Sequence, residues 1–281
     1  MKYVVISNPK RLEEIKSKIS KKGGGNFHVI SDFDRTLTKS FINGNKFTSI
    51  ISLLREGNAI SSYYEKKSHE LFNKYHPIEV DLKFPLKEKK KEMHEWWTTH
   101  FELLIKSGLN KKDLERVVES NKIQFREGCL EFFDFLHSKS IPLIIFSSSG
   151  LGDAIPMILK KNRRLYENIH IITNFFEWNK KGNAIKVKEP IIHVMNKDET
   201  SVKNYPFFDE IKNRKNVLLL GDSLGDIGMI NGFDYANLIK IGFLNEKIDE
   251  HLEIYKKNFD VIITDDNSMN YVNKLLKEII N

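Results

Sequence analysis

Short, mostly apolar runs alternate with amphipathic helical patterns along most of this chain, and no other feature restricts the fold as strongly. The runs lie at residues 27–31, 142–146, 170–173, 217–220, 238–241 and 261–264. Helical patterns lie at 9–22, 130–139, 154–162, 245–257 and 268–280. Runs this short and this continuously apolar are typical of parallel strands buried on both faces. The sequence therefore predicts an α/β fold, with a Rossmann-like parallel sheet covered by helices on both sides.

One long segment, residues 43–125, breaks this alternation because its pattern is almost entirely helical. Helical patterns cover 46–75, 86–106 and 111–120, and two prolines bracket a stretch at 76–81 that we expect to be irregular. The segment lies between the first and second core strands. We therefore expect residues 1–42 and 126–281 to form the core, with 43–125 inserted as an α-helical cap that determines substrate specificity.

Acidic and hydroxyl side chains follow three of the apolar runs. Asp32 and Asp34 follow the first run, residues 147–149 are three serines after the second, and Asp222 and Asp226 follow a later one. The carboxyl ends of parallel strands meet at one edge of a sheet, where ligands bind. Four carboxylates at one edge repel each other unless a cation lies among them. Because hard oxygen ligands favour Mg²⁺ and substrate phosphate completes its coordination, we expect a magnesium site that takes a phosphate ester.

The spacing of Asp32 and Asp34 adds a chemical argument. Residues i and i+2 of an extended segment project to the same side of the chain. One carboxylate can then attack a phosphorus atom while the other exchanges a proton with the leaving oxygen. An aspartyl-phosphate formed in this way is an established form of covalent catalysis.

Charge and composition narrow the range of partners. The net charge of +7 is compatible with nucleic acid or membrane headgroups, but it also suits a small anionic substrate. The chain lacks an interleaved basic and aromatic recognition motif, and an acidic edge repels a polyphosphate backbone.

The single cysteine, Cys129, excludes an intramolecular disulfide and fits a reducing compartment. No apolar stretch approaches the 18 residues of a membrane span, and the N-terminal apolar run is too short for a signal peptide, so we expect a cytoplasmic protein.

Three sequence motifs of this chain resemble those of the haloacid dehalogenase-like phosphohydrolases and occur in the same order. Residues 32–36 match the DxDxT motif, residues 146–150 resemble the hydrophobic strand ending in Ser or Thr, and residues 221–226 match GDxxxD. Nearly the whole chain, including the helical segment, is further similar to the cytosolic pyrimidine 5′-nucleotidases of type III. The stretches that carry this resemblance lie at 75–81, 95–98, 148–153, 192–197 and 240–245.

This resemblance implies roles for the acidic residues. Asp32 would be the nucleophile, and Asp34 would protonate the leaving nucleoside oxygen and then act as base on the hydrolytic water. Mg²⁺ would be held by Asp32, by the backbone carbonyl of Asp34 and by Asp222. Asp226 would hold either a metal-bound water or Lys197, which the resemblance makes the fixed cation on the phosphate.

The resemblance also implies residues that bind phosphate and base. Ser148 and Ser149 would cradle phosphate oxygens at a helix start. Counting from the Gly-Leu-Gly-Asp side selects Ser148 as the motif serine, whereas counting from the Ile-Pro side selects Ser147. Glu79 matches the nucleobase-binding glutamate, whose carboxylate can accept from an exocyclic amino group. His100 stands where the family has a base-contacting serine, so it either contacts the base, where it could favour a charged or methylated one, or simply packs.

The resulting expectation is Mg²⁺-dependent hydrolysis of nucleoside 5′-monophosphates, with CMP and UMP preferred, by a monomer that binds neither nucleic acid nor membranes. The sequence leaves open whether water or another nucleoside accepts the phosphate. Alternative substrates are 7-methylguanosine monophosphate and a small phosphate ester such as phosphoserine. A more remote alternative is a basic nucleic-acid-binding protein that has lost catalysis.

Overall fold

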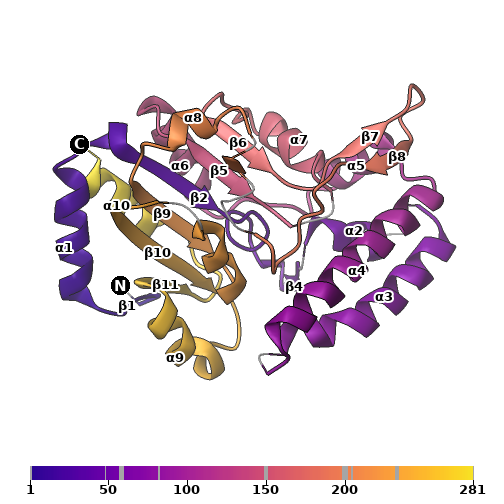
Figure 1. Ribbon diagram of the computed structural model, residues 1–281, viewed down its shortest axis with the longest axis horizontal. Helices are drawn as coiled ribbons and strands as arrows, with labels where there is room; N and C mark the ends of the chain where they lie inside the picture. Colours follow the sequence, from indigo (N-terminus) through magenta and orange to yellow (C-terminus); the bar gives the residue numbers. More distant parts are fainter. Residues whose placement is uncertain are drawn as a thin grey trace.

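A seven-stranded sheet lies at the core of the fold (Figure 1). The computed structural model describes residues 2–47, 49–56, 60–81, 83–148, 151–197, 202–203, 205–231 and 234–280. The strand order of the sheet is β1-β11-β10-β9-β2-β5-β6. The first strand pairs antiparallel to β11, and the other neighbours are parallel. The strands are β1 (Val4–Ile6), β2 (Phe27–Ser31), β5 (Leu143–Phe146), β6 (Ile169–Ile172), β9 (Asn216–Gly221), β10 (Asn237–Leu244) and β11 (Val261–Thr264). The α/β fold with a largely parallel sheet is therefore confirmed.

Alternate residues of the central strands pack into two different hydrophobic clusters. In β2, Val29 belongs to one cluster and Ile30 to the other, and in β9 Leu218 and Leu219 divide in the same way. This follows from the two-residue period of a strand, and it explains why the runs are apolar at every position.

Helices cover both faces of the sheet. The first cluster is covered by α1 (Pro9–Ser20), α6 (Cys129–Ser138), α7 (Ala154–Lys161) and α10 (Asn270–Ile279). The second is covered by α8 (Phe208–Ile211) and the 3₁₀ helix η3 (Leu224–Ile230), and α9 (Ile248–Asn258) packs against β10 and β11. A short 3₁₀ turn, η1 (Gly24–Asn26), leads into β2.

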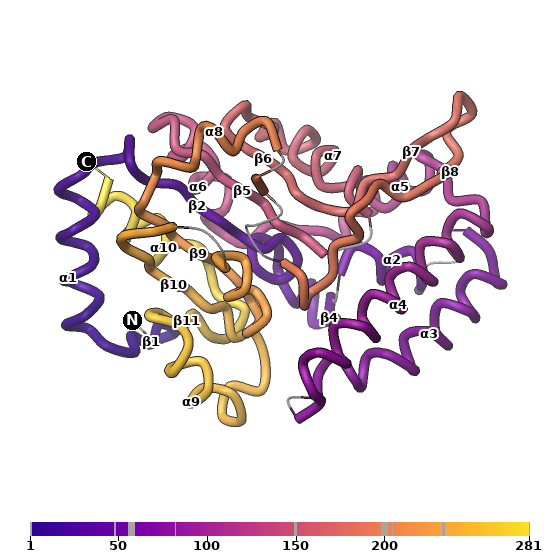
Figure 2. Tube along the Cα trace, in the orientation of Figure 1, coloured from indigo at the N-terminus to yellow at the C-terminus, as the bar shows by residue number. Residues whose placement is uncertain are grey.

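The helical segment lies at the opposite end of the molecule from α1 (Figure 2). It contains α2 (Ile50–Glu56), α3 (Ser62–Val80), α4 (Leu86–Lys106) and α5 (Lys111–Glu119), and the small hairpin of β3 (Phe41–Ile42) and β4 (Asn45–Lys46) precedes it. The expectation of an irregular stretch at 76–81 is wrong, because α3 continues through Pro77 to Val80. Helical bonding resumes beyond the proline, since the Asp81 amide donates to the Pro77 carbonyl at 3.2 Å.

A second hairpin, which the sequence patterns did not indicate, joins the helical segment to the rest of the fold. It consists of β7 (Phe176–Trp178) and β8 (Ala184–Val187). Its turn meets the start of α5, where the Lys111 amide donates to the Gly182 carbonyl at 2.9 Å. On its other side, the ring of Phe176 packs edge-on against Phe101 of α4. Helices α4 and α5 therefore contact a hairpin that comes from a later part of the chain.

The topology identifies one edge of the sheet as the place for a ligand. From β2 the chain continues, after the helical segment, to β5 on one side, whereas β9 lies on the other side. In open parallel sheets ligands bind beyond the strand ends where the strand order changes direction in this way. No helix among the described residues is long and apolar enough to cross a membrane.

Candidate active site

Three acidic side chains converge beyond the carboxyl ends of β2 and β9. Asp32 directly follows β2, and its backbone amide donates to the Leu220 carbonyl of β9 at 3.0 Å. Asp222 directly follows β9, and Asp226 lies in η3. One carboxylate oxygen from each of Asp32, Asp222 and Asp226 lies within 4.8 Å of the others. The structure thus brings together three of the four carboxylates that the sequence placed at this edge as one group.

Lys197 lies between two of these carboxylates. Its Nζ donates to Asp32 Oδ1 and, at 3.0 Å, to Asp226 Oδ1. All three side chains are buried. Burial lowers the pKa of Lys197, but the two carboxylates outweigh it and raise the pKa above its ordinary value. Burial raises the pKa of Asp32, an effect that Lys197 opposes and the other two aspartates reinforce. The lysine therefore stays charged and holds the Asp32 carboxylate in place.

Asp226 organises the turn that carries Asp222. Its Oδ2 accepts from the amide of Asp222 at 3.1 Å and from both the amide and the hydroxyl of Ser223 at 2.9 Å. This arrangement needs a glycine at position 221, where an added Cβ would lie 2.5 Å from the Asp226 Cβ. The GDxxxD pattern therefore has a steric reason for its glycine and a hydrogen-bonding reason for its last aspartate.

The donor set fits a divalent cation. Burial raises the pKa of Asp222 to about 6, with Arg35 opposing the rise and Asp226 adding to it. Among the described residues, Lys197 and Arg35 are the cations in ion pairs with the three clustered carboxylates. Several carboxylate oxygens with incomplete charge compensation are the environment that Mg²⁺ takes.

The turn after Asp34 is held in place by Arg126, whose role the sequence did not indicate. Asp34 is half-buried, and the following Arg35 has a left-handed backbone with φ of 62°. The guanidinium of Arg126 is almost fully buried and donates to several acceptors of neighbouring loops: the carbonyls of Arg35, Thr36 and Asn267 and the side chain of Asn245. It also pairs with Asp266 at 2.9 Å. No periodicity or motif marks a buried arginine of this kind in advance.

The second-motif serines follow β5. The amide of Ser147 continues the sheet ladder by donating to the Ile172 carbonyl at 3.0 Å, and its side chain is buried. Ser148 is half-buried, and its carbonyl accepts from the Asn174 side chain at 3.4 Å. Ser149 lies outside the described residues. The greater exposure of Ser148 favours it over Ser147 as a ligand-contacting serine.

The two base-binding candidates lie on the helical segment in different surroundings. Glu79 is partly exposed on α3, and its Oε2 accepts from His76 Nδ1 at 3.0 Å. His100 is buried on α4, where its ring stacks on Trp97 and its Nε2 hydrogen-bonds the Tyr64 hydroxyl at 3.0 Å. Burial lowers the pKa of His100 to about 3, so its ring is neutral. These contacts agree with the packing alternative for His100.

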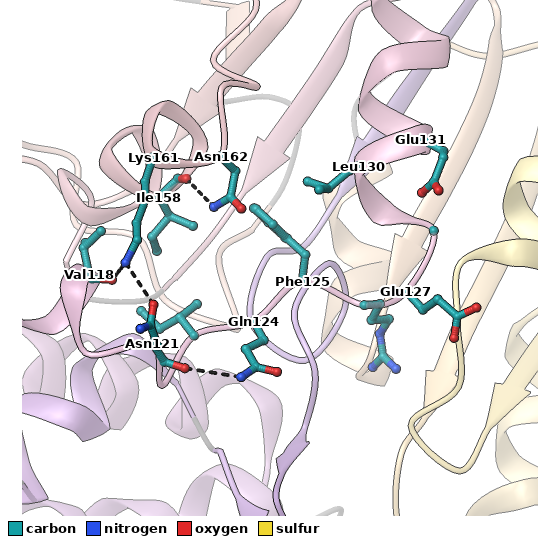
Figure 3. A pocket seen from close by; sticks show the side chains of 13 residues that line it. Val118, Asn121, Gln124, Phe125, Glu127, Leu130, Glu131, Ile158, Lys161 and Asn162 are labelled. Carbon is teal, nitrogen blue, oxygen red and sulfur yellow. Dashed lines mark hydrogen bonds between the residues drawn. The ribbon is translucent and has the colours of Figure 1, made fainter.

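A cavity of about 500 Å³ is lined in part by Arg126. Figure 3 shows the side chains around it. The cavity is lined by Asn121 and residues 123–128 together with side chains of α5, α6 and α7. Phe125 and Arg126 both line it, and Phe125 forms a β-bridge with Thr38. None of the clustered carboxylates lines this cavity, so it is separate from the candidate active site.

Known proteins resemble this chain in both sequence and fold. The family model for pyrimidine 5′-nucleotidase (UMPH-1) matches residues 35–280. The chain belongs to the pyrimidine 5′-nucleotidase family. It is 36% identical over 278 residues to 7-methylguanosine phosphate-specific 5′-nucleotidases of Rattus norvegicus and Homo sapiens, with 99% of this chain and 92% of each relative covered. As a member of this family it is a 5′-nucleotidase, a phosphoric monoester hydrolase.

Solved structures agree with membership of the pyrimidine 5′-nucleotidase family. The structure of cytosolic 5′-nucleotidase IIIB bound to cytidine superposes with a TM-score of 0.91 at 27% identity, covering 99% of this chain and 94% of that one. A phosphoserine phosphatase superposes with a TM-score of 0.54 at 18% identity, covering 88% of this chain and 96% of that one. The second match shows a shared haloacid dehalogenase-like fold and nothing about substrate.

Proposed function

We propose that this chain hydrolyses nucleoside 5′-monophosphates in an Mg²⁺-dependent reaction that passes through a phosphorylated Asp32. The observation that carries the proposal is the buried ion pair of Asp32 with Lys197 inside the carboxylate cluster. Asp32, the backbone carbonyl of Asp34 and Asp222 would hold the metal ion. Bound there, Mg²⁺ offsets the repulsion between the nucleophile and the anionic phosphate.

Asp32 and Asp34 divide the chemistry. The Asp32 carboxylate attacks phosphorus, the bond from phosphorus to the nucleoside oxygen breaks, and Asp34 donates its proton to that oxygen. Asp34 then takes a proton from water as the water attacks the aspartyl-phosphate, which releases phosphate and restores Asp32. A second nucleoside in place of that water would give phosphate transfer instead of hydrolysis.

Phosphate and base are bound by different parts of the chain in this proposal. Lys197, Ser148 and Ser149 bind the phosphate oxygens, and Asp226 keeps Lys197 in position. The segment 43–125 acts as a cap over the core formed by 1–42 and 126–281 and selects the base.

Base preference is the point on which two candidates compete. Cytosine presents an exocyclic amino group that Glu79 can accept from, which favours CMP, and membership of the pyrimidine 5′-nucleotidase family extends the preference to UMP. 7-Methylguanosine monophosphate is the second candidate, because the relatives at 36% identity are named for that substrate. Its cationic base also suits the Glu79 carboxylate and aromatic rings close to it. His76, which hydrogen-bonds Glu79, stacks on Phe72 with ring centroids 4.5 Å apart. We further propose a monomer that acts in the cytoplasm.

Phosphate release from CMP, UMP, dTMP, 7-methyl-GMP and AMP, each with Mg²⁺ and with a chelator, tests the proposal. We expect release that requires Mg²⁺, with CMP and UMP above AMP. A maximum at 7-methyl-GMP would select the second candidate. Equal release with the chelator, or release from none of these nucleotides when phosphoserine, added as a further substrate, is hydrolysed, would contradict the proposal.

A further inference from the structure

Arg35 occupies the variable position of the DxDxT motif, and its guanidinium lies between two carboxylates. Its Nε is 3.5 Å from Asp222 Oδ2, and its Nη2 donates to Glu246 Oε1 at 2.8 Å. Glu246 also pairs with Lys46 of β4 at 2.7 Å. A continuous row of alternating charges therefore runs from the β3–β4 hairpin to the carboxylate cluster.

The backbone of Arg35 is fixed, which limits where its side chain can go. Its left-handed conformation turns the chain directly after Asp34. Its carbonyl accepts from Arg126 Nη2 and, at 3.0 Å, from Asn245 Nδ2. The side chain is only about one-quarter exposed, with Ser40 Oγ 3.3 Å from its Nε. The guanidinium is thereby confined to the space between Asp222 and Glu246.

We propose that Arg35 is a positioning residue that acts as the built-in counter-ion of Asp222 and thereby sets the affinity of the site for Mg²⁺. This inference rests on the proposed function, in which Asp222 is a metal ligand. Lys197 pairs with Asp32 and Asp226, whereas the direct ion pair of Asp222 in the described part of the chain is with Arg35. Lys197 and Arg126 also favour the charged form of Asp222, but less than Arg35 does. The guanidinium keeps Asp222 oriented, but its positive charge also repels an incoming divalent ion. Glu246 reduces this repulsion because its carboxylate pairs with the same guanidinium.

The proposal predicts opposite effects for two substitutions. Arg35→Met removes the repelling charge and should tighten Mg²⁺ binding by about five- to tenfold, the size of a screened interaction between charges several ångströms apart. Glu246→Gln releases the guanidinium toward Asp222 and should weaken Mg²⁺ binding several-fold. Arg35→Lys keeps the charge and should stay close to the wild-type affinity. A purely structural role would weaken binding in every variant.

Isothermal titration of each variant with MgCl₂ alone, without nucleotide, measures these affinities at fixed ionic strength and pH 7.5. Arg164→Met is the matched control, because that side chain is 25% exposed against 24% for Arg35 and also pairs with an aspartate, Asp134. Thermal unfolding checks that each variant is folded, and Glu246→Gln tests the proposal even if Arg35→Met does not fold.

The outcomes separate the inference from the proposed function. Tighter Mg²⁺ binding by Arg35→Met together with weaker Mg²⁺ binding by Glu246→Gln supports the inference. If one of the two variants is unfolded, the expected change in Mg²⁺ affinity of the other supports it. Wild-type Mg²⁺ binding with unchanged or weakened binding in a folded Arg35→Met overturns the inference and leaves the proposed function standing. A wild-type protein that binds no Mg²⁺ overturns the inference, and it overturns the proposed function as well if phosphate release from CMP is unchanged by a chelator.

Discussion

Replacing Lys197 by methionine should destabilise the protein as well as inactivate it. The substitution keeps most of the side-chain volume but leaves Asp32 and Asp226 facing each other without their shared cation. The side chain of Lys197 is 2% exposed, and those of its partners are 7% and 2% exposed. Removing one member of a buried ion pair costs about 3–5 kcal/mol. With an unfolding entropy of roughly 0.6 kcal/mol/K for a chain of this length, Tm should fall by about 5–8 °C.

Differential scanning calorimetry in metal-free buffer at pH 7.5 measures this change. The double variant Lys197→Met/Asp226→Asn should recover part of the lost stability, because one of the two uncompensated carboxylates is gone. Phosphate release from CMP should fall at least about a hundredfold in both variants, since the fixed cation on the phosphate is absent. A single variant with wild-type Tm, or a double variant less stable than the single one, would refute this account of the buried pair.

Three further predictions concern recognition, the turn before Asp222 and pH. Glu79→Ala should raise KM and reorder the base preference more than it lowers kcat, and an unchanged ranking of CMP, UMP and purine nucleotides would remove Glu79 from recognition. Gly221→Ala places a methyl group 2.5 Å from Asp226 and should cost about 1–3 kcal/mol by denaturant unfolding, whereas Gly25→Ala, with open space around it, should be neutral. His100 has a folded pKa of about 3, below that of the unfolded chain, so its contribution to stability is present above pH 6.5 and is lost as pH falls. Between pH 7 and 5.5 the loss should be about 1 kcal/mol, and His100→Gln should remove that part of the pH dependence.

The core elements could be predicted because their patterns are long or continuous. The expected helix at 86–106 has the observed bounds of α4, and the apolar runs all became strands of the central sheet. The hairpin of β7 and β8 was missed because its strands have three and four residues and carry charged side chains. Pro77 was taken as a helix breaker, but packing of α3 along α4 holds the helix through it.

The sequence could predict those site residues whose positions follow directly from the strand they follow. Asp32 and Asp222 follow neighbouring parallel strands, so their convergence follows from topology. Lys197 entered through family resemblance, because one lysine in a lysine-rich chain has no distinguishing pattern. Arg35 and Arg126 could not be found in advance, since their contacts depend on a left-handed turn and on loops from distant parts of the chain. The division into core and cap stays a prediction.

Phosphate release from CMP by the wild-type protein and by Asp32→Asn, each with Mg²⁺ and with a chelator, tests the nucleophile most directly. Of the four conditions, only the wild-type protein with Mg²⁺ should release phosphate at an appreciable rate, and thermal unfolding should show that the variant is folded. Release by a folded Asp32→Asn at close to the wild-type rate, or by the wild-type protein in chelator, would contradict the central claim.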